Sequence, residues 1–105
     1  MPHLYIVRAT VPDADRRAAF DDWYRREHLP DAVKTFGADK GWRYWSESDP
    51  SQHLAVYQFA DRAALDRGTQ GEGSKRLIAD FNRDWPDVPR TREILTLVET
   101  TDSNL

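Results

Sequence analysis

The sequence shows one order of elements twice within 105 residues: a strand, an amphipathic helical segment and a strand. In the first half, residues 3–11 predict a strand, residues 13–28 a helix and residues 41–47 a second strand. In the second half, residues 53–59 and 90–100 predict strands on either side of helical segments. This order is typical of a ferredoxin-like β-α-β-β-α-β fold of the α+β class, with the helices on one face of a four-stranded antiparallel sheet.

The first helix is predicted from its spacing and its boundaries. Asp13 or Asp15 can cap its N-terminus. Leu29 precedes Pro30, and a residue before proline is disfavoured in the α region, so the helix should end or kink near His28, before a short turn. Its apolar stripe needs a sheet to cover it and comprises Ala19, Phe20, Trp23 and Tyr24.

The second half should begin with a hairpin, because residues 48–51 are dense in turn formers. Asp61 is then expected to cap a short helix that ends at Gly68. Residues 68–73 are expected to form a loop, and Ser74 to cap the last helix. The apolar residues of that helix again have helical spacing: Leu77, Ile78, Phe81 and Trp85.

Composition predicts one small domain at residues 1–100 and a polar tail at residues 101–105. A net charge of −3 without blocks of like charge disfavours nucleic acid as a partner. The absence of cysteine excludes disulfides and thiolate metal sites and is consistent with a reducing compartment. There is no signal-peptide pattern and no run of about 20 apolar residues, so we expect no membrane contact and a cytoplasmic protein.

The predicted sheet has one face that its helices leave open. Exposed tryptophan and tyrosine side chains on that face would form a large apolar patch, and such patches usually mark an interface. We therefore expect a homodimer through sheet-to-sheet packing. A pocket for a small organic molecule is expected between the sheet and the helices.

A series of residues resembles the dimeric α+β barrel superfamily, and within it the EthD-like group most closely. The resemblance covers roughly residues 4–65 and implies a ferredoxin-like fold, a homodimer whose sheets form a barrel, and a pocket in each subunit. Superfamily members include cofactor-free monooxygenases, lactone isomerases, polyketide cyclases, haem-handling enzymes and stress-response proteins, so the fold does not define the reaction. The resemblance depends on Phe20, Trp23-Tyr24, Glu27-His28-Leu29-Pro30, Phe36-Gly37, Arg43-Tyr44 and residues 54–59.

His28 is the first candidate for catalysis. A histidine at a helix end beside a kink can reach a pocket and titrate near neutral pH, so it could act as a general acid or base. Alternatively, it caps the helix C-terminus or bonds to Asp31. Tyr24 lies one helical turn earlier, and the phenol and imidazole could together hold a polar substrate group. Packing in the core is the alternative for Tyr24.

The second strand offers two further candidates for substrate contact, Arg43 and Tyr44, which face opposite sides of the sheet. The sequence does not show which side meets the helices. Arg43 could bind a substrate carboxylate in a bidentate manner, or form an intersubunit salt bridge to Glu47 or another acid.

Tyr57 and Trp23 complete the set of candidate substrate contacts. Tyr57 could supply a pocket hydroxyl or pack across the strands, and Trp23 could contact a ligand or pack against the sheet. His3 and His53 begin their strands and could approach His28, but none of them shows close ligand spacing. We expect no metal and no cofactor.

The sequence therefore favours a small-molecule enzyme that acts on an aromatic or cyclic substrate by cofactor-free oxygenation, isomerisation or cyclisation, with His28 moving the proton. The alternative is a non-catalytic homodimer that binds a metabolite or shields apolar surface under stress. A third hypothesis is a tautomerase, in which removal of Met1 exposes the amine of Pro2 as a base.

Overall fold

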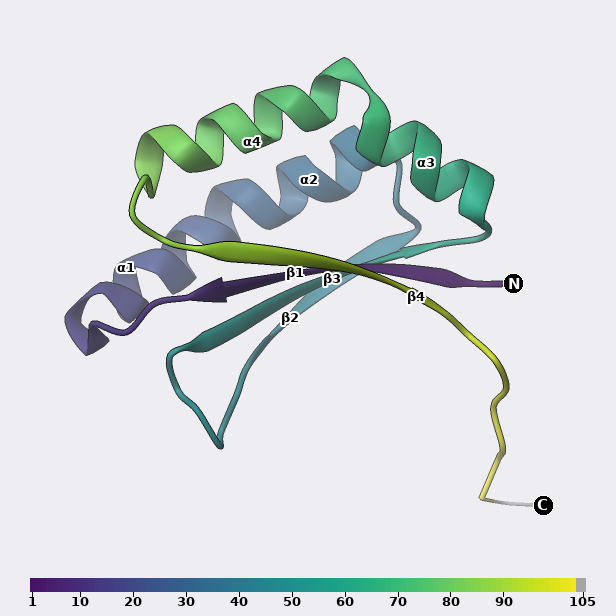
Figure 1. The fold of residues 1–105 in the computed structure, drawn as a ribbon, viewed down its shortest axis with the longest axis horizontal. Helices are drawn as coiled ribbons and strands as arrows, with labels where there is room; N and C mark the ends of the chain where they lie inside the picture. The colour runs from purple at the N-terminus through teal and green to yellow at the C-terminus, as the bar shows by residue number, and fades with distance from the viewer. Residues whose placement is uncertain (104–105) are drawn as a thin grey trace.

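One four-stranded antiparallel sheet organises residues 1–103, the part of the chain that the computed structural model describes. All the helices of this part lie on one side of the sheet (Figure 1). The arrangement confirms the α+β, ferredoxin-like fold predicted from the order of elements. The strands follow the spatial order β2-β3-β1-β4, with β1 at His3–Thr10, β2 at Lys40–Trp45, β3 at Gln52–Phe59 and β4 at Arg90–Thr96.

The first helical segment runs without a break from Ala14 to Phe36. Asp13 caps it, as one of the two predicted residues, and accepts a hydrogen bond from the backbone N–H of Asp15 at 2.9 Å. Of the two predicted possibilities near His28, an end or a kink, the helix does not end there, and its irregular turn lies at that place. It comprises α1 (Ala14–Trp23), a π-helical turn η1 (Tyr24–His28) and α2 (Leu29–Phe36).

Pro30 accounts for the π-helical turn. Inside an α-helix its ring would crowd the carbonyl group four residues earlier, and it has no N–H to donate. The wider turn gives the ring room, and the N–H of Leu29 donates to the carbonyl of Tyr24, five residues back. Pro30 therefore lies in the first turn of α2, where proline is tolerated.

The second helical segment departs from the prediction at Gly68. Asp61 caps α3 (Arg62–Gln70) as expected, accepting from the N–H of Ala64 at 2.8 Å. The helix continues through Gly68, however. This glycine allows close packing of the helix, because a Cβ there would collide with the carbonyl oxygen of Phe36. The predicted loop is reduced to Gly71, which precedes α4 (Glu72–Asp84), and Ser74 is a buried residue within α4 rather than its cap.

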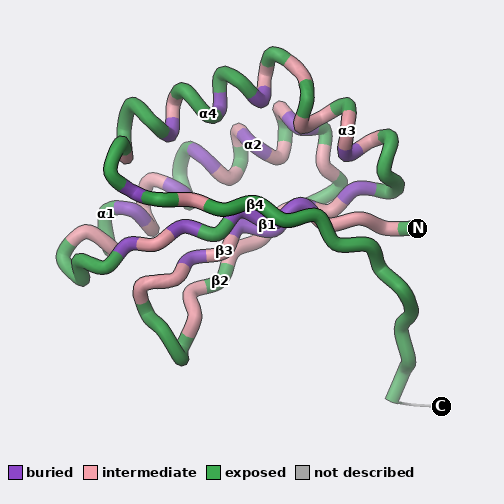
Figure 2. The backbone as a smooth tube through the Cα atoms, in the orientation of Figure 1, coloured by how far each residue is buried: buried purple, intermediate pink, exposed green. Residues whose placement is uncertain are grey.

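The inner face of the sheet, under the helices, holds the core. Strand alternation directs Tyr5 and Val7 of β1 and Tyr57 of β3 toward the helices, and buried positions concentrate in these two strands (Figure 2). Phe20 of α1 is fully buried among aromatic rings. The helices therefore place their aromatic side chains directly above polar and aromatic residues of the sheet.

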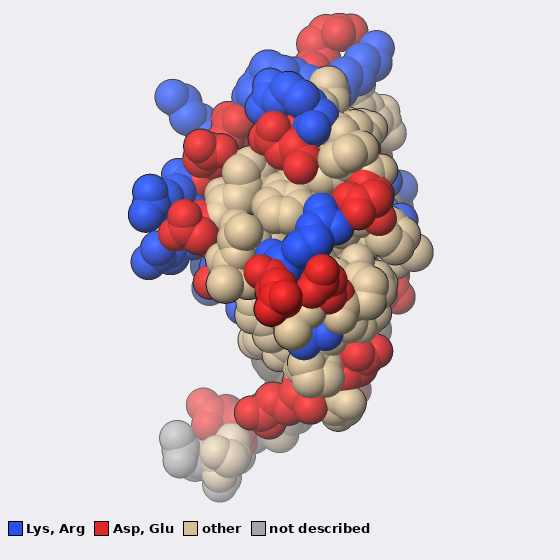
Figure 3. Space-filling view, turned by 90° about the vertical axis from the view of Figure 1, so that its left-hand side faces the viewer, with Lys and Arg blue, Asp and Glu red and all other residues tan. Residues whose placement is uncertain are grey.

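The outer face of the sheet has no helix over it (Figure 1). Its apolar residues come from all four strands and include Leu4, Trp42, Leu54 and Leu95, while the Tyr44 side chain is 56% exposed. On the end of the molecule near α1, basic and acidic side chains are intermixed (Figure 3). Within residues 1–103, no helix has the length and apolarity needed to cross a membrane.

The last strand is shorter than predicted, ending at Thr96 rather than Thr100. Residues 97–103 are exposed and lead away from the sheet (Figure 1). Of the expected polar tail at residues 101–105, residues 104–105 lie outside the described part of the chain.

Candidate functional site

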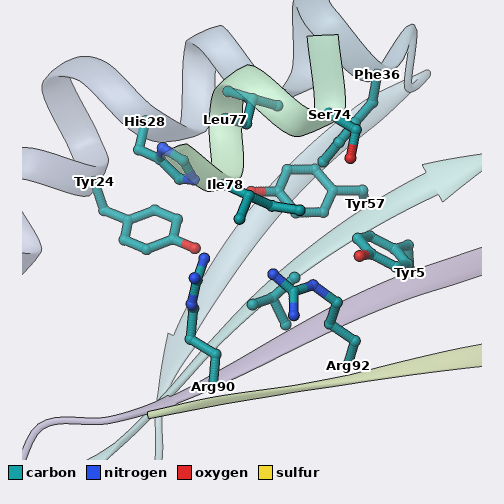
Figure 4. Close-up of a pocket in the computed structure, with 11 residues that line it drawn as sticks. Tyr5, Tyr24, His28, Phe36, Tyr57, Ser74, Leu77, Ile78, Arg90 and Arg92 are labelled. Atoms are coloured by element: carbon teal, nitrogen blue, oxygen red, sulfur yellow. The ribbon is translucent and has the colours of Figure 1, made fainter. Parts of the chain in front are cut away.

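A small cavity lies between α4, the π-helical turn and the inner face of the sheet (Figure 4). Its volume of about 20 Å³ has room for about one water molecule. A larger ligand can enter only after side chains at the edge of the cavity move. The lining residues are Tyr5, Val7, Tyr24, His28, Phe36, Tyr57, Ser74, Leu77, Ile78, Arg90 and Arg92.

His28 forms part of the cavity wall and is itself buried among aromatic rings. Its imidazole stacks on Trp23 with 4.6 Å between ring centroids and meets the ring of Tyr24 edge-on at 4.9 Å. Burial lowers the pKa of His28 to about 4, although the negative charge of Asp31 opposes this shift. The expectation that His28 titrates near neutral pH is therefore wrong. At pH 7 its imidazole is neutral, and one ring nitrogen can accept a proton.

Two tyrosine hydroxyl groups meet beside this imidazole. Tyr24 comes from the π-helical turn and Tyr57 from β3, and a hydrogen bond between their side chains influences the acidity of both. Burial raises the pKa of Tyr24 to about 12 and that of Tyr57 well above its ordinary value. Both side chains are therefore neutral phenols at pH 7. Because one hydroxyl proton is used in the bond between them, the pair has one O–H left to donate to an oxygen that gains negative charge.

Arg43 faces the helices, and its guanidinium contacts side chains of its own chain. Its Nη1 donates to Oδ1 of Asp21 at 3.0 Å and lies 3.1 Å from Nε2 of His53. The indole N–H of Trp45 donates to the same Asp21 oxygen at 2.9 Å. Arg43 therefore pairs with Asp21 rather than Glu47, and it does not line the cavity.

His53 links this group of polar side chains to the core. A guanidinium can only donate, so Nε2 of His53 accepts from Arg43 and Nδ1 carries the proton. Nδ1 is buried and has no hydrogen-bond partner within residues 1–103. Burial, with the positive charge of Arg43, lowers the pKa of His53 to about 3, so this imidazole is also neutral at pH 7.

The predicted site residues are divided between two faces of the sheet. Trp23, Tyr24, His28 and Tyr57 come together on the inner side, with Trp23 behind the imidazole rather than in the cavity lining. Tyr44 lies on the outer face. Pro2 also lies there, in a groove of about 530 Å³ that it shares with Trp42 and Leu95.

Sequence reasoning missed two arginines of the cavity wall, Arg90 and Arg92. They pair with Ala9 and Val7 of β1, whose side chains face the helices. The available signal was their two-residue spacing at the start of a strand, which puts both side chains on one face. Within residues 1–103, no group of three or more histidine, aspartate or glutamate side chains could hold a metal ion.

Comparisons with known proteins identify the fold. The sequence matches no family model, and no curated protein matches it. Solved structures resemble it at low sequence identity. A variant of SnoaB, a cofactor-independent oxygenase from Streptomyces nogalater, has a TM-score of 0.71 and 15% identity, over 94% of this chain and 95% of that chain.

Two further solved structures resemble the chain in fold. An EthD family protein from Bacillus halodurans has a TM-score of 0.70 and 16% identity, covering 91% of this chain and 99% of its own. HapK from Hahella chejuensis has a TM-score of 0.69 and 14% identity, covering 96% and 97%. The chain therefore shares the ferredoxin-like α+β fold of these structures, the fold that the sequence predicted.

Proposed function

We propose that this protein is a small-molecule enzyme in which His28 takes a proton from an aromatic or cyclic organic substrate. The observation that carries the proposal is a neutral imidazole in the wall of a cavity, beside two neutral phenols. The fold similarity to a cofactor-independent oxygenase is consistent with such chemistry. Proton removal would begin an oxygenation, an isomerisation or a cyclisation without a built-in cofactor.

The low pKa of His28 restricts the substrate. A base whose pKa is about 4 is weak, so the proton that it takes must belong to a group acidified by its surroundings, such as a phenol or a carbon next to a carbonyl group whose oxygen accepts a hydrogen bond in the site. Loss of that proton leaves negative charge on a substrate oxygen. The free hydroxyl proton of the hydrogen-bonded pair Tyr24 and Tyr57 would stabilise this charge. The imidazolium would then return the proton as a general acid.

Hydrogen–deuterium exchange tests the proton step before the substrate is known. We expect the protein to accelerate exchange of the α-protons of cyclic ketones and 1,3-diketones in D₂O, followed by NMR. His28→Gln should slow the exchange by about 100-fold or more, as is usual for loss of a general base. His3→Gln is the control, since His3 lies outside the cavity lining. Equal rates for wild type and His28→Gln would contradict the role of His28.

A second candidate function is non-catalytic binding of a metabolite, because the apolar side chains of the cavity wall, Phe36, Leu77 and Ile78, could hold a ring without reacting with it. Such a protein would bind the cyclic ketones without accelerating exchange. The tautomerase hypothesis has its own outcome in the same assay, because Pro2→Ala rather than His28→Gln would then abolish exchange. Pro2 lies in the outer groove, away from His28.

The proposed enzyme is a homodimer that packs outer face against outer face. The argument is the apolar character of a sheet face without a helix to cover it, with Trp42, Leu54 and Leu95 from three different strands. A twofold pairing would cover the same patch on both subunits. It would also leave the two cavities on the inner faces, one in each subunit.

A further inference from the structure

The arginines of the cavity wall differ from most arginines of the chain in having no carboxylate partner. Ion pairs to aspartate or glutamate hold eight other arginines: Arg8, Arg16, Arg25, Arg26, Arg43, Arg62, Arg76 and Arg83. Neither Arg90 nor Arg92 forms such a pair within residues 1–103. Arg17 and Arg67 also lack an ion pair to aspartate or glutamate within residues 1–103, but only Arg90 and Arg92 combine that lack with a place in the cavity wall.

The two guanidinium groups extend from β4 toward the tyrosines of the cavity (Figure 4). Arg90 lies over the ring of Phe81, 3.8 Å from its centroid, and donates to the neutral amide oxygen of Asn82 at 2.6 Å. Arg92 interacts with the hydroxyl of Tyr5. Burial, together with the positive charge of Arg92, lowers the pKa of Arg90. Two like charges are therefore held close together at a partly buried site.

This arrangement is unfavourable until an anion joins it. A partly buried cation loses hydration, and a nearby cation adds repulsion, while an anionic partner offsets both. A guanidinium matches a carboxylate in a bidentate geometry. On the helical side, the cavity wall also presents three apolar side chains, Phe36, Leu77 and Ile78. The cavity wall thus combines two positively charged guanidinium groups with an apolar surface against which a ring can pack.

We propose that Arg90 and Arg92 bind the carboxylate of an aromatic or cyclic acid, whose ring lies against the apolar wall near His28. The proposal rests on the proposed function, because it names the substrate class of the same cavity. Arg92 is exposed on an edge strand, so its side chain can swing outward and admit a ligand larger than a water molecule. The carboxylate then takes the place of the missing partner of both arginines.

A titration with benzoate and benzamide tests the charge requirement, because the two probes share a ring and differ in charge. We expect benzoate to bind at least about tenfold more tightly, as measured by NMR shifts and calorimetry. Arg90→Gln and Arg92→Gln should each weaken benzoate binding by about tenfold or more and leave benzamide binding unchanged. Arg67→Gln is the matched control, since it removes an exposed arginine on α3 that is outside the cavity.

Several outcomes would overturn the proposal. These are equal affinities for benzoate and benzamide, equal losses in Arg92→Gln and Arg67→Gln, and no saturable binding of benzoate or 1-naphthoate at ~10 mM. Tighter binding of phenyl phosphate than of benzoate would assign the site to a phosphate and reject the carboxylate. The wild-type protein separates this proposal from the proposed function: benzoate binding without acceleration of proton exchange would reject the proposed function alone, whereas exchange without a preference for benzoate over benzamide would reject the carboxylate site alone.

Discussion

The two faces of the sheet have different chemistry although they are built from the same strands. On the inner face, Tyr57, His53 and Arg43 lie under helices, and their polar groups meet other side chains of the chain. On the outer face, Trp42 and Tyr44, which flank Arg43 in β2, have no helix over them. The direction of successive side chains alone thus decides which residues of a strand lie under the helices and which lie on the open face. The comparison predicts different consequences for substitutions on each side.

The largest expected effect is on the inner side. Phe20→Ala removes a fully buried ring that packs on Tyr24, His53 and Phe81. We expect the free energy of unfolding to fall by about 3–5 kcal/mol, because the cavity left behind cannot collapse between rigid rings. Urea denaturation measures this loss. A loss below about 1 kcal/mol would show that the helix layer packs loosely on the sheet.

The second largest expected effect is that of acid, which should lower the free energy of unfolding through buried groups on the inner side of the sheet. Burial lowers the pKa values of His28 to about 4 and of His53 to about 3, so below about pH 6.5 the unfolded chain takes up protons that the folded chain refuses. Their contribution to stability is complete above that pH and declines as the pH falls, by about 1.4 kcal/mol per pH unit for each histidine.

Urea denaturation at pH 7.5, 6 and 5 measures this slope. His53→Gln should reduce it by about half, since one of the two buried imidazoles is removed. A wild-type free energy of unfolding that does not change between pH 6 and pH 5 would contradict the burial of the two neutral imidazoles.

A substitution on the outer face should change assembly instead of folding. Tyr44 is 56% exposed, so Tyr44→Glu should leave the fold of one chain intact and put a charge into the expected dimer interface. We expect the dimer dissociation constant to rise by about tenfold or more, which corresponds to about 1.4 kcal/mol. Light scattering during size-exclusion chromatography measures it, with Arg67→Glu on α3 as the control. A wild-type protein that is monomeric would contradict the expected dimer.

The smallest effect is expected where neither face is involved. Asp61→Ala removes the cap of α3 and should lower the free energy of unfolding by about 1 kcal/mol. Asp61→Asn retains an oxygen that can accept from the N–H of Ala64, so it should cost less. Thermal denaturation of the two variants side by side makes the comparison. Equal losses would show that the charge of Asp61 matters more than its hydrogen bond.

The sequence predicted the elements that depend on local patterns. Strand propensity and helical spacing placed all four strands and the order of the helices, and Asp61 was recognisable as a cap because its side chain acts on the adjacent turn. Gly68 was misread as a helix end. Its close approach to Phe36 joins residues far apart in the chain, and no local pattern reveals such a contact.

The candidate site was predicted only in part, because some of its contacts are local in the sequence and others join distant elements. Tyr24 and His28 are four residues apart on one helical segment, so their proximity could be read from spacing. Arg90 and Arg92 reach the cavity only because β4 pairs with β1 across most of the chain length. The pKa of His28 depends on burial by several elements, which explains why a histidine expected to titrate near neutral pH does not.

The π-helical turn has a consequence for how this chain is aligned with others. A π-helical turn holds one residue more than the α-helical turn it replaces. A relative with an unbroken α-helix here would be one residue shorter between Tyr24 and His28, and its alignment would need a gap at that point. An alignment that omits the gap would pair His28 with a neighbouring position, about 100° away around the helix. Comparisons of histidines in this segment therefore need structural superposition as well as sequence.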